Sequence, residues 1–60
     1  MWIIFTNDPF FKGKTLYYAG DGAFNFEIKL AKQYSTWAET EKEMDYIKNN
    51  YELETQAVKV

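Results

Sequence analysis

Residues 36–51 read TWAETEKEMDYIKNNY, a stretch with the spacing of an amphipathic helix. At about 100° per residue, its large apolar side chains and one threonine fall on a single face roughly 80° wide. These residues are Trp37, Thr40, Met44, Ile47 and Tyr51. Most charged and amide side chains of the stretch, such as Glu39, Lys42 and Asn50, lie off that face. A helix of this kind packs its apolar face on another layer, and the aromatic-rich first half of the chain supplies that layer.

The start of this helix is marked by Thr36 and Glu39, which fit the capping-box pattern. In that motif each side chain bonds the backbone N–H of the other residue. Lys48 suits the negative end of the helix dipole. Because asparagine tolerates a left-handed backbone, Asn49 and Asn50 are predicted to end the helix.

Four extended segments surround the helix in the sequence. Residues 1–6, 15–19 and 23–27 are rich in β-branched and aromatic side chains and are separated by turn residues. Residues 52–60 return as a last strand, and a break in their alternation indicates either a bulge near Gln56 or Ala57 or a regular strand that begins only at about Gln56. The chain is therefore predicted to be one small α+β domain over residues 1–60, an antiparallel sheet of three to four strands with one amphipathic helix packed across it, in the order β-β-β-α-β.

The segment 28–35 has two open interpretations, a helical turn or a bend that leads into a brief extended piece. Ile28, Leu30 and Ala31 are its expected buried members. Neither interpretation changes the predicted order of the main elements.

The residue types exclude several classes of chemistry. The 60 residues contain no cysteine and no histidine, which removes disulfides, thiolate metal sites and the commonest proton shuttle at neutral pH. Carboxylates four residues apart, such as Glu39 and Glu43, belong to solvated helix faces far more often than to catalytic pairs. We therefore expect no catalytic, cofactor or metal site, and we expect that the protein is not an enzyme.

The first strand is apolar on both of its faces. Met1, Ile3 and Phe5 form one row and Trp2 and Ile4 form the other. One helix covers one face of a small sheet, so a second apolar face remains. This pattern predicts a homodimer, with Trp2 and Ile4 as self-association residues, and leaves sheet packing and edge pairing equally open.

Aromatic residues make up 20% of the chain, more than one small core can bury. The adjacent Phe10 and Phe11 stand in a loop and cannot easily both point inward. Tyr46 lies about 140° from the centre of the apolar helix face and should point to solvent. It is either a tolerated surface ring or the centre of a partner-binding site. Three polar residues would form the rim of such a site, namely Glu39, Glu43 and Asn50.

A resemblance to a known group follows from several of these segments. The N-terminal Met-Trp-Ile-Ile strand, the Tyr17–Tyr18 hairpin and the run AKQYST (31–36) before an acidic helix resemble small accessory proteins of phages and prophages of Gram-positive bacteria. Thr40 departs from the alanine more typical there. The resemblance implies an accessory protein acting in the bacterial host cytoplasm and supplies no catalytic residues. The apolar start of the chain is too short for a signal peptide or a membrane span, so we expect a soluble protein.

Two function classes remain. The first is a non-enzymatic protein–protein interaction module that binds and modulates or inhibits a host protein, for example one of an antiviral defence system. The alternative is a nucleic-acid-linked regulator, which would stack single strands on an aromatic sheet or imitate DNA with its acidic helix. The chain has no arginine and seven lysines against nine acidic residues, so direct nucleic-acid binding is disfavoured.

Overall fold

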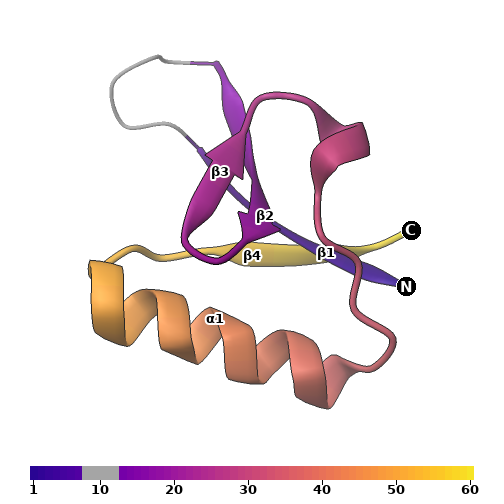
Figure 1. Cartoon of the computed structure of the whole chain (residues 1–60), viewed down its shortest axis with the longest axis vertical. Coiled ribbons are helices and arrows are strands. Elements are labelled where there is room, and N and C mark those ends of the chain that lie inside the picture. Colours follow the sequence, from indigo (N-terminus) through magenta and orange to yellow (C-terminus); the bar gives the residue numbers. More distant parts are fainter. Residues whose placement is uncertain (8–12) are drawn as a thin grey trace.

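The computed structural model describes residues 1–7 and 13–60. It contains a four-stranded antiparallel sheet in the order β3-β2-β1-β4 and one α-helix (Figure 1). The elements are β1 (Trp2–Asn7), β2 (Thr15–Gly20), β3 (Ala23–Asn25), the 3-10 helix η1 (Ile28–Leu30), α1 (Trp37–Tyr51) and β4 (Gln56–Lys59). This arrangement confirms the predicted α+β class and the order of its elements.

The first strand of the chain occupies the middle of the sheet. β1 pairs antiparallel with β2, where Phe5 lies opposite Tyr17, and with β4, where Ile3 lies opposite Val58. Beyond the end of the β1–β2 pairing, the backbone of Tyr34 exchanges two hydrogen bonds with Trp2, each 2.8 Å long. Both edges of β1 are therefore paired, as suits a strand this rich in β-branched and aromatic residues.

The main core lies between the sheet and α1. Ile4 and Ile47 are fully buried and pack with Tyr18 and Tyr34. The Trp2 and Ile4 row therefore faces the helix, and Ile4 has no exposed surface to offer a second copy. The assignment of Ile4 to self-association is wrong, because the alternation of a strand defines two rows without showing which one the helix covers. Trp2 is half-buried, its ring centroid 5.0 Å from that of Trp37.

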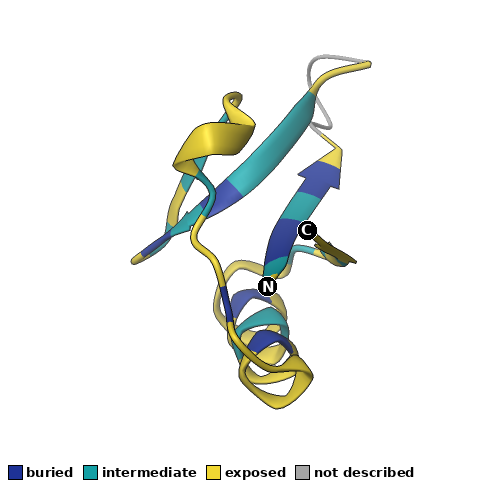
Figure 2. Ribbon diagram, turned by 90° about the vertical axis from the view of Figure 1, so that its right-hand side faces the viewer, coloured by how far each residue is buried: buried dark blue, intermediate teal, exposed yellow. Residues whose placement is uncertain are grey.

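The opposite face of β1 is covered only in part. η1 lies on the side of β1 away from α1 (Figures 1 and 2), and Ile3 is only 2% exposed. The prediction that Ile28 and Leu30 are buried is wrong, since they are 56% and 48% exposed. No residue of η1 is buried, so its side chains remain on the surface of the molecule.

β3 ends earlier than the alternation predicts. The side-chain oxygen of Asn25 accepts a 2.9 Å hydrogen bond from the N–H of Glu27, a local turn that competes with the sheet ladder. Phe24 therefore packs on the core, 5.1 Å from the ring of Tyr18, whereas Phe26 leaves the sheet and is exposed.

The predicted start of the helix is confirmed. The hydroxyl oxygen of Thr36 accepts a 3.2 Å hydrogen bond from the N–H of Glu39. The Glu39 carboxylate accepts from the Thr36 hydroxyl at 3.3 Å rather than from its backbone. The buried hydroxyl of Thr40 donates to the Thr36 carbonyl at 2.8 Å, so this polar group is satisfied beneath the helix.

The predicted end of the helix is two residues too early. α1 continues to Tyr51, and Glu52 takes the left-handed conformation at φ 52° and ψ 38°. The Asn50 amide instead donates a 2.8 Å hydrogen bond to the Tyr46 carbonyl one turn back. A side chain that stays bonded within the helix does not mark its end.

Candidate partner-binding surfaces

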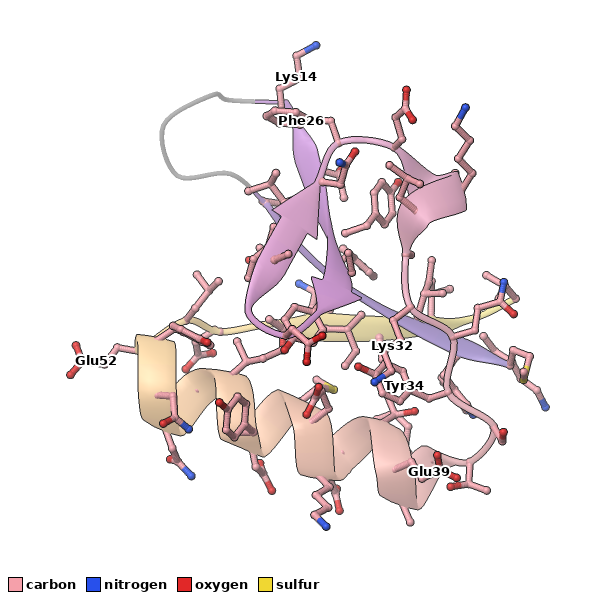
Figure 3. All side chains as sticks on the ribbon, in the orientation of Figure 1. Lys14, Phe26, Lys32, Tyr34, Glu39 and Glu52 are labelled. Atoms are coloured by element: carbon pink, nitrogen blue, oxygen red, sulfur yellow. The ribbon has the colours of Figure 1, made fainter. Side chains whose placement is uncertain are left out.

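A groove of about 340 Å³ separates the first part of α1 from the extended segment before it. We call it the helix groove. It is lined by Lys32, Gln33, Tyr34, Glu39, Lys42, Glu43 and Tyr46. In Figure 3, Lys32 and Tyr34 come from the segment before the helix and Glu39 from the start of α1.

The wall opposite α1 is held by backbone hydrogen bonds at both ends. The N–H of Lys32 donates to the Tyr18 carbonyl at 2.9 Å, and Tyr34 pairs with Trp2 as described above. Residues 32–34 thus lie between the end of β2 and the start of β1. These hydrogen bonds hold the backbone of residues 32–34 in place, and with it the points from which their side chains extend into the groove.

Tyr34 connects the two walls. Its side chain is 6% exposed, and its hydroxyl donates a 3.3 Å hydrogen bond to a carboxylate oxygen of Glu43. Burial, followed by the negative charge of Glu43, raises the pKa of Tyr34 above its ordinary value. The ammonium of Lys32 lies 5.5 Å from the centroid of the same ring, within the range of a cation–π contact.

Tyr46 stands at the rim of the helix groove and is 48% exposed. Its ring meets that of Tyr51 edge-on, with centroids 6.2 Å apart, so its position is constrained by a neighbour. Around it the groove offers two ammonium groups and two carboxylates. A half-exposed tyrosine among polar groups of both signs matches the composition of a protein interface, where a rigid ring binds at low entropic cost.

Three predicted contact residues, Glu39, Glu43 and Tyr46, come together in this groove. Asn50 does not line it, and Phe10 and Phe11 lie outside the described residues. The sequence reasoning missed Lys32, Tyr34 and Lys42. A lone aromatic residue between Gln33 and Ser35 was the available signal for Tyr34, but it lay in the segment with two open interpretations.

A second hollow, of about 580 Å³, opens near the start of β2. It is lined by Gly13, Lys14, Thr15, Tyr17 and Phe26, and Figure 3 shows Lys14 and Phe26 side by side. The aromatic sheet proposed for base stacking, with the rings of Tyr17, Tyr18, Phe24 and Phe26, is not exposed as a whole, because Tyr18 is 1% exposed and Phe24 packs on the core. Of the aromatic residues and lysines, Tyr17, Phe26 and Lys14 line this hollow.

Within residues 1–7 and 13–60, no group of three or more potential ligand side chains is placed to hold a metal ion. In the same ranges, no helix combines the length and the apolar character needed to cross a membrane.

Comparison with known proteins adds no relative. No protein-family model, no curated protein sequence and no solved structure matches this chain significantly.

Proposed function

We propose that this protein is a non-enzymatic protein–protein interaction module whose partner docks in the helix groove. The observation that carries the proposal is Tyr46, half-exposed at the rim of a groove whose opposite wall is fixed to the sheet. A preformed groove with a restrained tyrosine binds with little loss of conformational entropy.

The electrostatics of the groove favour binding over catalysis. A tyrosine hydroxyl is protonated near neutral pH already at its ordinary pKa, and burial raises the pKa of Tyr34 further, so this hydroxyl serves as a hydrogen-bond donor to Glu43 and not as a base. The groove combines Lys32 and Lys42 with Glu39 and Glu43, so it can pair with both signs of charge on a partner. Such mixed polarity supports selection of one partner over others.

The setting we propose for this interaction is the cytoplasm of a bacterial host. It rests on the resemblance of the chain to phage accessory proteins. In that setting the partner is a host protein, and its modulation or inhibition is the function.

Affinity capture with matched variants tests this proposal. The tagged protein, its Tyr46→Ala variant and its Asn49→Ala variant are each immobilised and exposed to a lysate of Gram-positive bacteria. Asn49 is exposed on α1 and does not line the helix groove, so its variant is the control. We expect one host protein to be retained by the wild type and by Asn49→Ala and to be lost with Tyr46→Ala. Equal retention by all three, with circular dichroism showing each one folded, would reject the groove as the docking site.

The hollow beside Lys14 favours a second candidate, binding of single-stranded nucleic acid. Tyr17 and Phe26 line it together with Lys14, a small version of a stacking site with one cation. A gel-shift assay at low salt separates this function from the first. Binding that fades with added salt and is lost in Tyr17→Ala would favour nucleic acid. The absence of a shift would favour the interaction module.

The other form of the nucleic-acid alternative is imitation of DNA by the acidic face of α1. That face is interrupted in the helix groove by Lys42.

A further inference from the structure

The outer edge of β4 carries backbone groups that pair with no strand among residues 1–7 and 13–60. β4 is at the edge of the sheet, whose strand order is β3-β2-β1-β4. Val60 and Met1 exchange backbone hydrogen bonds, 2.8 Å from the Val60 N–H and 3.4 Å from the Met1 amine. In an antiparallel ladder the N–H and C=O groups of successive residues face opposite sides of the strand. The N–H and C=O of Val58 therefore also face β1, whereas those of Ala57 and Lys59 face outward.

The neighbouring strand supports this alternation. Trp2 lies opposite Lys59, and its N–H and C=O are turned away from β4 toward Tyr34. The carbonyl of Glu54 faces β1, where the Thr6 hydroxyl donates to it at 2.9 Å. Odd-numbered residues of this segment therefore direct their backbone groups to the open edge, and even-numbered residues direct theirs inward.

An acidic hollow adjoins the same edge. It measures about 160 Å³ and is lined by Met44, Asp45, Lys48, Glu54 and Thr55. Lys48 pairs with Glu54 at 3.2 Å. Asp45 is exposed and forms no ion pair with any residue that the structure describes. The hollow can therefore take one further cation.

We infer that two copies of this chain pair antiparallel along β4, about a twofold axis at Ala57. An axis perpendicular to the sheet keeps the helices of both copies on one side. It sets Ala57 opposite Ala57 of the partner subunit and Lys59 opposite Thr55 of the partner subunit. Lys59 lies opposite Trp2 and so points to the helix side, where it enters the acidic hollow beside Asp45 of the partner subunit.

A second copy fits this edge better than an unrelated strand for two reasons. Each copy supplies both halves of the contact, one lysine and one acidic hollow, so the charges are complementary twice over. The outward N–H and C=O of Ala57 can exchange two hydrogen bonds with the same groups of the partner subunit's Ala57, the pattern of an antiparallel ladder. This surface is separate from the helix groove, so the dimer and the foreign partner can be tested independently.

Light scattering coupled to size exclusion tests the pairing through the backbone. We expect the wild type at micromolar concentration to have about twice the 7.1 kDa mass of one chain. Proline at Ala57 removes only an outward N–H and should give a folded monomer, whereas Ala57→Ser keeps that N–H and should remain a dimer. A wild-type mass of one chain at every concentration, or a folded Ala57→Pro dimer, would overturn the proposal.

A charge exchange tests the register. Lys59→Glu and Asp45→Lys each bring like charges together twice, and each should raise the dissociation constant by about tenfold or more. Mixing the two variants creates a heterodimer in which both contacts are again of opposite sign. We expect the mixture to recover the wild-type dimer mass. A mixture that pairs no better than either variant alone would contradict the proposed register.

Discussion

Tyr34 is the residue that joins most parts of this small molecule. Its backbone pairs with Trp2, its buried ring joins the core with Ile4 and Ile47, and its hydroxyl reaches Glu43 on the helix. One side chain thus couples the sheet, the groove wall and α1. Substitution here should affect both stability and the shape of the helix groove.

Alkaline pH should weaken the fold through buried tyrosines. The pKa values of Tyr34 and Tyr18 are raised above 10.0 mainly by burial. Their stabilising contribution is complete below pH 10.0, where the unfolded chain is also neutral, and declines as the pH rises toward the folded-state pKa. We expect the melting temperature to fall as the pH is raised above about 10, and to fall less steeply in Tyr34→Phe. Parallel slopes for the two proteins, followed by circular dichroism, would show that Tyr34 is not responsible.

The cap at Thr36 should have a measurable energy. Replacing Thr36 by alanine leaves the Glu39 N–H without its side-chain acceptor, which at such positions costs about 1 kcal/mol. Urea unfolding measures the loss. Ser35→Ala serves as the control, since Ser35 is exposed and precedes the cap. Equal stability of Thr36→Ala and Ser35→Ala would mean that the cap contributes nothing.

At the scale of elements, the helix shows what periodicity can and cannot predict. Thr40 and Ile47 are fully buried as the helical spacing predicts. Trp37 and Tyr51, on the same face, are 47% and 48% exposed because they stand at the two ends of α1. The angle around a helix is encoded locally, but the extent of the layer beneath it is not. The end of the helix at Glu52 was not predicted, because the left-handed position there is occupied by glutamate and not by glycine or asparagine, the usual residues.

The buried face of α1 should be intolerant of charge. Ile47→Asp places a carboxylate against Ile4 and Tyr18 without a partner, and we expect it to prevent folding. Met44→Asp should cost less, since Met44 is only partly buried. Asn49→Asp introduces the same charge at an exposed position and should fold normally. Circular dichroism and solubility distinguish the three, and a folded Ile47→Asp would mean that the face is assigned wrongly.

At the scale of the whole molecule, the class and order of elements followed from the sequence but the candidate site did not. Strand composition, turns and the cap are local features that predict the fold directly. The helix groove requires residues 32–34 to insert beside Trp2 and meet the helix there, a contact that no local pattern encodes. Glu43 and Tyr46 were predictable because the surface of a helix can be derived from its period. Tyr34 was not, since its role depends on distant partners.

The β2–β3 turn and the end of α1 meet at Gly22. A methyl group added there would come 2.5 Å from the Tyr51 hydroxyl, and the φ of +80° is unfavourable for other residues. Gly13 has nearly the same φ, +81°, but has no atom within 4 Å of that position. Gly22→Ala should therefore destabilise the protein more than Gly13→Ala in urea unfolding. Equal losses would mean that only the backbone conformation matters and that the turn does not depend on Tyr51.

The central place of β1 also constrains the order of events during synthesis. β1 is the first element of this domain in sequence order, and one of its two partners, β4, is the last element. Joining these strands closes a loop of almost the entire chain, the kind of non-local pairing that slows folding. Until β4 emerges, one edge of the apolar β1 has no partner within its own chain. Exposed strand edges of this kind invite aggregation, so the domain is most vulnerable while β4 is not yet available to pair with β1.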